Sequence, residues 1–142
     1  MHSSHLVVTG VPSRPAFVPE LSHSSGWISI LKPVKQEREF FDPADVAWAA
    51  ALGVRGVTEK VLSTGDGPVL TRLARWEPGL DTVEAGVIRH DYIEEVYLLE
   101  GDLTDLTLNR TFHAGEYACR PVGMAHGPYR TEAGCTMLEI RY

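Results

Sequence analysis

From Gly56 onward the chain is a series of short apolar segments separated by glycine, proline and aspartate residues. Each segment has the length of a β-strand and is shorter than a typical helix. The expected strands are residues 57–62, 69–76, 83–90, 95–99, 103–110, 116–120 and 135–142. Many short strands between turn signals are typical of a β-sandwich or a β-barrel. This texture therefore predicts an all-β domain.

The residues before this region predict one helix and an N-terminal arm. Residues 41–52 (FDPADVAWAAAL) have Asp42 as a helix cap, a proline suited to the first turn, and Gly53 where a helix would end. Residues 1–35 are rich in serine, histidine and proline, and we expect an irregular arm that includes a strand near its end. Residues 36–142 would then form one domain with one short helix.

Length and charge limit the functions that the chain can perform. Its 142 residues suit a single domain, and no apolar stretch reaches the roughly 20 residues of a membrane helix. The 19 acidic residues outnumber the 13 basic ones, so there is no basic face for nucleic acid. The chain start does not look like a secretory signal. We expect a cytoplasmic protein whose partner is a small molecule, not nucleic acid or a membrane.

Three side chains are candidates for binding a metal. If residues 91–93 reverse the chain, Glu94 begins a strand close to His90, on the same face as the apolar residues that follow. His126 comes after a Pro-x-Gly turn that directs it toward the same interior. Two histidines and one carboxylate form the facial set of ligands that non-heme Fe(II) oxygenases use.

The second of these stretches resembles the second motif of the cupins, G-x5-P-x-G-x2-H-x3-N. The residues that match it at every spacing are Gly115, Pro121, Gly123 and His126. Arg130 stands where asparagine is usual.

The first stretch resembles the first cupin motif, G-x5-H-x-H-x3–4-E-x6-G, through His90, Glu94 and Gly101. Ile88 occupies the position of the first metal-binding histidine. The loss of one imidazole leaves two alternatives, a three-residue metal site or a site without metal. In the second case the buried carboxylate would need an arginine partner or a proton.

The resemblance covers roughly residues 54–142 and implies a cupin fold, a β-sandwich or jelly-roll barrel. It implies a divalent metal held by His90, Glu94 and His126, with Fe(II) favoured over Zn, Mn or Ni. Residues 94–105 and 119–135 resemble the subgroup that contains the anti-sigma factor ChrR, and small single-domain cupins also include diketone and hydroxyacetophenone dioxygenases and polyketide cyclases. Cupins often dimerise, so the arm would suit a homodimer.

These features support three hypotheses about function. The first is a metal-dependent dioxygenase acting on an enolisable or aromatic carbonyl compound. The second is a non-oxidative polyketide-type cyclase or isomerase, in which a Zn-like metal polarises a carbonyl while Glu94 or His113 moves a proton. The third is a metal- or ligand-binding sensor module. In each case we expect Ile88, Met124 and Tyr129 to line the pocket.

Overall fold

The computed structural model describes residues 35–142. The strand expected near the end of the arm, and all of the arm except its last residue, lie outside the described residues. Within residues 35–142, no helix has the length and apolar character needed to cross a membrane.

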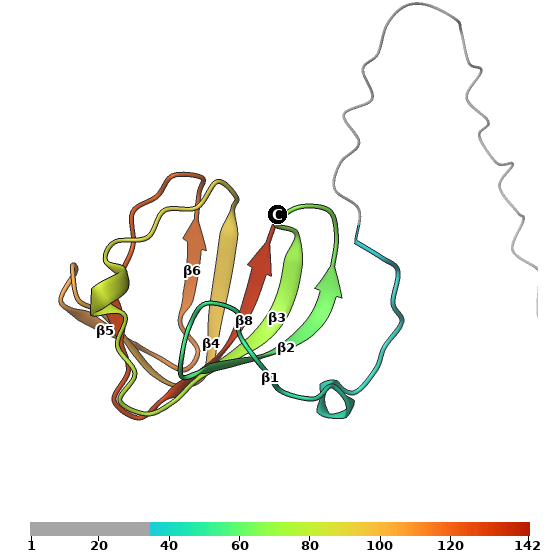
Figure 1. Ribbon diagram of the computed structural model, residues 1–142, viewed down its shortest axis with the longest axis horizontal. Helices are drawn as coiled ribbons and strands as arrows, with labels where there is room; N and C mark the ends of the chain where they lie inside the picture. The colour runs from blue at the N-terminus through green and yellow to red at the C-terminus, as the bar shows by residue number, and fades with distance from the viewer. Residues whose placement is uncertain (1–34) are drawn as a thin grey trace, which may run out of the picture. The chain divides into compact units, whose positions relative to one another are not determined.

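The regular structure of the described residues is almost entirely antiparallel strand, which confirms the predicted all-β fold. The strands are β1 Ala49–Ala50, β2 Val57–Thr64, β3 Leu70–Trp76, β4 Glu94–Asp105, β5 Arg110–His113, β6 Tyr117–Arg120, β7 Tyr129–Arg130 and β8 Cys135–Arg141. Strands β2, β3, β8, β4 and β6 lie side by side in this order (Figure 1). Two short 3-10 helices, Pro43–Asp45 and Val83–Ala85, complete the regular structure.

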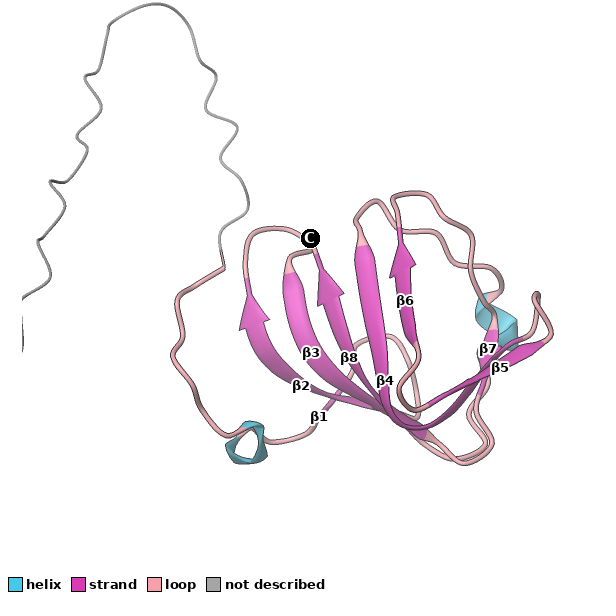
Figure 2. Ribbon diagram, turned by 180° about the vertical axis from the view of Figure 1, so that it is seen from behind, coloured by secondary structure: helices cyan, strands magenta, loops and turns pink. Residues whose placement is uncertain are grey.

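Strand β4 belongs to both layers of the sandwich. Its first half lies between β8 and β6, and its second half pairs with β5 and β7, which lie to the right of β6 in Figure 2. The apolar core fills the space between the layers. Its buried members are Ala74, Val96, Leu98, Leu103, Tyr129, Cys135 and Met137.

A β-bulge between Leu98 and Glu100 changes which residues of β4 point inward. Before the bulge the even-numbered Glu94 and Leu98 are buried, and after it the odd-numbered Leu103 and Asp105 are buried. An extra residue in one strand shifts the side-chain alternation by one position. The prediction of separate strands over 95–99 and 103–110 is therefore wrong, because one long strand continues through the bulge.

The predicted helix over residues 41–52 is also wrong. Asp42 does cap a first turn, since its carboxylate accepts a hydrogen bond from the Ala44 amide at 2.8 Å, but this turn ends at Asp45. The chain is then extended, and β1 pairs with Thr58 and Glu59 of β2. Isolated helices of this length are marginal in water, whereas strand pairing satisfies the backbone groups through a tertiary partner.

The expected strand over residues 83–90 is replaced by the second 3-10 helix and a loop. Only Ile88 makes a strand-like contact, an isolated antiparallel bridge to His126. This loop carries one of the predicted metal ligands, so its position depends on its partner loop and not on a continuous strand.

Candidate metal centre

Backbone hydrogen bonds join the two loops that carry the histidines. The Ile88 amide donates to the His126 carbonyl at 2.9 Å, and the His126 amide donates back to the Ile88 carbonyl at 3.1 Å. The Gly123 amide donates to the His90 carbonyl at 2.8 Å. Two histidines that are distant in the sequence are therefore held beside each other by main-chain contacts.

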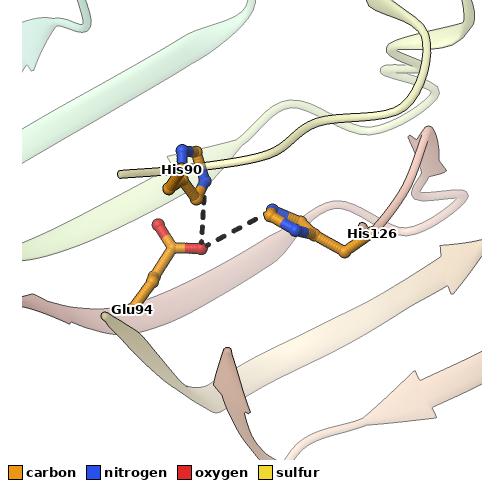
Figure 3. Close-up of side chains that lie close together, drawn as sticks. All are labelled: His90, Glu94 and His126. Atoms are coloured by element: carbon orange, nitrogen blue, oxygen red, sulfur yellow. Dashed lines mark ion pairs between the residues drawn. The ribbon is translucent and has the colours of Figure 1, made fainter. Parts of the chain in front are cut away.

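The carboxylate of Glu94, the first residue of β4, faces both imidazole rings (Figure 3). Its Oε2 atom is 3.6 Å from Nε2 of His90 and 3.9 Å from Nε2 of His126. One ligand atom from each of the three side chains lies within 4.8 Å of the others. Ligands of one transition-metal ion are about 2 Å from it, so only a small contraction would bring the three atoms onto a common ion.

The hydrogen bond of the His126 ring selects the nitrogen that faces the centre. Nδ1 lies 3.1 Å from the Met124 carbonyl, which can only accept a hydrogen bond, so Nδ1 carries the proton in the neutral ring. The lone pair is then on Nε2, the atom that points toward Glu94. Burial lowers the pKa of His126 and favours this neutral form. Such fixing of the tautomer is typical of metal-binding histidines.

An aromatic ring supports His90. The imidazole stacks on Tyr92, with ring centroids 4.5 Å apart and an angle of 12° between the planes. The guanidinium of Arg141 lies over the Tyr92 ring, 5.3 Å from its centroid. His90 therefore has a defined orientation although it belongs to a loop.

Two arginines neutralise the Glu94 carboxylate. Arg120 Nη1 donates to Oε2 at 2.7 Å, and Arg141 Nε lies 3.4 Å from Oε1. Burial raises the pKa of Glu94, but the charge and hydrogen bond of Arg120 outweigh it and hold the pKa below its usual value. Glu94 is therefore an ionised carboxylate with an arginine partner. This is one of the two arrangements expected for a buried carboxylate at a site without metal.

Two neighbouring cavities lie beside this centre. The larger, about 680 Å³, is lined by His90, Glu94 and His126. The smaller, about 570 Å³, has a mainly apolar lining. The side chains that line both cavities are Leu103, Arg120, His126 and Tyr129. His90 and Glu94 line only the larger cavity, so the apolar cavity lies beside the centre and shares with it the candidate ligand His126.

The three residues expected to line a pocket all border these cavities. Ile88 lines the larger cavity and Met124 the smaller one. Tyr129 lines both, and its hydroxyl accepts a hydrogen bond from Arg120 Nη2 at 2.9 Å. Burial raises the pKa of Tyr129 to about 12, so its hydroxyl keeps its proton at neutral pH.

The structure does not bring His113 to the centre. It is exposed at the end of β5, where it pairs with Asp102, and it borders a separate hollow. Strand β5 pairs with the half of β4 beyond the bulge, whereas Glu94 lies at the opposite end of that strand. The sequence prediction that His113 could move a proton at this site is therefore wrong.

The two arginines beside Glu94 were not predicted from the sequence. Both are register partners of Glu94, Arg120 on β6 and Arg141 on β8. On β6 alternation permits either Cys119 or Arg120 to face inward, and the structure places Arg120 inside and Cys119 outside. A prediction would have required the strand pairing, which the sequence pattern does not specify.

Solved structures that resemble this chain have the cupin fold. The anti-sigma factor ChrR of Rhodobacter sphaeroides, solved in complex with SigE, is 25% identical, with a TM-score of 0.51 over 67% of this chain and 49% of ChrR. The polyketide cyclase RemF of Streptomyces resistomycificus is 20% identical, with a TM-score of 0.59 over 74% of this chain and 79% of RemF. An acetylacetone dioxygenase of Acinetobacter johnsonii is 15% identical, with a TM-score of 0.60 over 73% of each chain.

Comparison of the sequence alone matches one family. No curated protein matches the chain as a sequence relative. The sequence model of the ChrR cupin-like domain, by contrast, matches residues 36–140. This match spans both predicted motifs and nearly all of the described structure, and the chain therefore belongs to the family of ChrR cupin-like domains.

Proposed function

We propose that the chain is a small metal-dependent enzyme that acts on an enolisable or aromatic carbonyl compound, as a non-heme iron dioxygenase. The observation that carries this proposal is the convergence of His90, Glu94 and His126, whose ligand atoms lie within 4.8 Å of one another beside a cavity. Two imidazoles and a carboxylate suit Fe(II) and leave coordination positions open for substrate and oxygen.

Each side chain has a defined role in this proposal. His126 and His90 would bind the metal through Nε2, and Glu94 would bind it through Oε2. A bound divalent iron would supply Lewis acidity and reactivity toward O2. Arg120 would hold Glu94 in position through its 2.7 Å hydrogen bond, as residues behind a ligating carboxylate commonly do.

The apolar side chains of the smaller cavity would contribute to substrate binding. Val96, Leu98 and Leu103 border the smaller cavity and would cover the hydrocarbon part of a substrate. A water-poor environment strengthens electrostatic contacts with the substrate oxygens and limits side reactions. Resemblance to an acetylacetone dioxygenase supports a diketone as the first substrate to test.

A non-oxidative cyclase or isomerase is the second candidate, supported by the resemblance to the polyketide cyclase RemF. The cyclase hypothesis named Glu94 or His113 as the group that moves a proton. Because His113 lies outside the centre, Glu94 is the one that remains. Glu94 is also one of the three candidate metal ligands and would not be free to act as an acid or base, which disfavours this candidate relative to the dioxygenase.

The test is metal analysis together with oxygen consumption. Untagged protein, purified without chelator, would be analysed for metals and assayed under air with acetylacetone and with a hydroxyaryl ketone. His126→Ala removes a proposed ligand, and His113→Ala is the matched control because His113 lies on the exposed end of β5. We expect near-stoichiometric iron and oxygen uptake in the wild type and His113→Ala, and neither in His126→Ala.

Other outcomes separate the remaining hypotheses. Zinc with turnover that does not need oxygen would favour the cyclase or isomerase. Absence of any metal would overturn the metal-dependent enzyme, and co-purification of a protein partner without turnover would then favour a sensor module.

The proposed homodimer, which would use the arm over residues 1–35, predicts a mass in solution of twice 15.7 kDa by light scattering.

A further inference from the structure

Six charged side chains with little exposure form a connected group that includes the candidate ligand Glu94. They are Glu59 on β2, Arg72 on β3, Glu94 on β4, Arg120 on β6, and Glu139 and Arg141 on β8. We call this group the ionic cluster. Arg72 bridges Glu59 at 2.6 Å and Glu139 at 2.7 Å, and Arg141 joins Glu139 at 3.0 Å. Together with the contacts of Glu94, these bonds link all six side chains.

The ionic cluster is already neutral without a metal. It contains three guanidinium groups and three carboxylates, and each carboxylate has at least one arginine partner. In a facial site with a lone carboxylate, by contrast, the carboxylate offsets one of the two charges of the ion. Here a divalent cation would add two positive charges that the ionic cluster does not offset. The other carboxylates on the larger cavity, Glu77, Asp81 and Glu84, are exposed to solvent, which screens their charge.

Uncompensated charge is costly away from water. Removing an ion from water is expensive unless an opposite charge accompanies it. The loaded centre would therefore favour a ligand that brings a negative charge of its own over a neutral ligand of the same shape. Water and hydroxide can supply part of this compensation, but an organic anion can displace them and also fill the apolar cavity.

Arg120 lies where such an anion would be bound. It borders both cavities, and its bonds to Glu94 and to the Tyr129 hydroxyl use two of its five N–H donors. A planar guanidinium suits the two oxygens of a carboxylate or an enolate. Beside it, Val96, Leu98 and Phe112 line the smaller cavity and would contact an apolar body.

We propose, on the basis of the metal centre proposed above, that this site selects an organic oxyanion with an apolar body, and that Arg120 is a specificity-determining residue that contacts the oxyanion. The substrate class is thus a carboxylate or an enolate that is charged when it binds, in preference to a neutral ketone.

The experiment compares two probes of nearly equal shape, benzoate and benzamide, by calorimetry with the full chain. Protein loaded with Zn²⁺, which is redox-inert, and metal-free protein are both titrated at pH 7.5, and the zinc content of each sample is measured. We expect the loaded protein to bind benzoate at least tenfold more tightly than benzamide. The metal-free protein, whose ionic cluster is neutral, should lose this preference.

Variants test the role of Arg120. Arg120→Gln, loaded with added zinc until its measured zinc content equals that of the wild type, should weaken benzoate binding at least fivefold, whereas Arg120→Lys keeps the charge and should retain most of the affinity. Arg110→Gln is the matched control, because the Arg110 side chain is 65% exposed and lies outside the ionic cluster. Circular dichroism of each variant checks that it is folded.

The outcomes are distinguishable. Protein that takes up no zinc would overturn both the metal centre and this inference. Zinc uptake with equal or absent binding of the two probes would overturn the oxyanion preference and leave the metal centre intact. An undiminished preference for benzoate in folded Arg120→Gln would overturn the role of Arg120.

Discussion

Glu94 and Arg120 lie opposite each other in the β4–β6 pair, and Nη1 of Arg120 is 2.7 Å from Oε2 of Glu94. The same oxygen faces both His90 and His126. A single carboxylate atom thus receives the guanidinium and points at the two imidazoles. Without a metal, Arg120 is the nearer of the two arginines that compensate the charge of this buried carboxylate.

Removing Arg120 should therefore destabilise the metal-free protein. Arg120 is the nearer of the two cations beside the buried Glu94 carboxylate, and without it only Arg141, at 3.4 Å, remains. Breaking a buried ion pair is strongly destabilising, and we expect Arg120→Gln to lower the free energy of unfolding by about 3 kcal/mol in urea denaturation. Arg110→Gln, which breaks an exposed pair with Glu116, should cost less than about 1 kcal/mol. Equal effects of the two substitutions would contradict the structural role assigned to Arg120.

The position of Ile88 allows a gain-of-binding test. Ile88 lines the larger cavity and forms a backbone bridge with His126, so a histidine there would face the other three ligands. We expect Ile88→His to tighten zinc binding at least about tenfold, or about 1.4 kcal/mol, by competition with a chelator. Val87→His, on the adjacent exposed residue, should leave the affinity unchanged. An unchanged affinity in Ile88→His would show that this loop does not present its side chain to the metal.

Gly101 should be far less tolerant of a side chain than Gly53. Both glycines have a positive φ, +79° and +80°, so alanine at either costs about 1–2 kcal/mol for backbone strain. A Cβ atom at Gly101 would also overlap the carbonyl oxygen of Gly134, whereas nothing lies within 4 Å of one at Gly53. Thermal denaturation should therefore show a loss for Gly101→Ala that exceeds that for Gly53→Ala by about 1–3 kcal/mol.

Glu94 should make the stability of the metal-free protein depend on pH. The pKa of Glu94 is lower in the folded protein than its ordinary value of 4.5, so the ionised form stabilises the fold fully above pH 4.5. This contribution is lost as the pH falls from 4.5 through the folded pKa. The stability difference between wild type and Glu94→Gln, measured by urea unfolding, should narrow over that range.

A second carboxylate on the same strand provides the control for this pH test. Glu100 is exposed on β4, and Glu100→Gln should follow the wild-type pH profile. If the difference in unfolding free energy between wild type and Glu94→Gln stays constant down to pH 3, the ion pair with Arg120 does not set the acid sensitivity of the fold.

The sequence was most informative where local spacing carries the structure. The Pro-x-Gly turn before His126 and the reversal before Glu94 are local features, and the three predicted ligands do converge. The partners of Glu94 escaped prediction because they come from strands that approach only in the folded sheet. The helix predicted over the alanine-rich stretch before Gly53 was wrong for a related reason, since the pairing of this stretch with β2 overrides its helix propensity.

Residues on both sides of the bulge in β4 contribute to the candidate metal centre. Glu94 stands before the bulge, and Asp105 after it accepts hydrogen bonds from the amides of Thr107, Leu108 and Gly127. Gly127 is the residue directly after His126. The strand thus provides one candidate ligand itself and anchors the loop of another.

Deleting one residue at the bulge would turn every later side chain of β4 to the opposite face. Asp105 would then leave the interior and release Gly127, although all the candidate ligands would still be present. The centre consequently depends on the number of residues in β4 as well as on their identity. Family members should differ in length in the connecting loops, whereas the distance along the chain from Glu94 to Asp105 should be invariant.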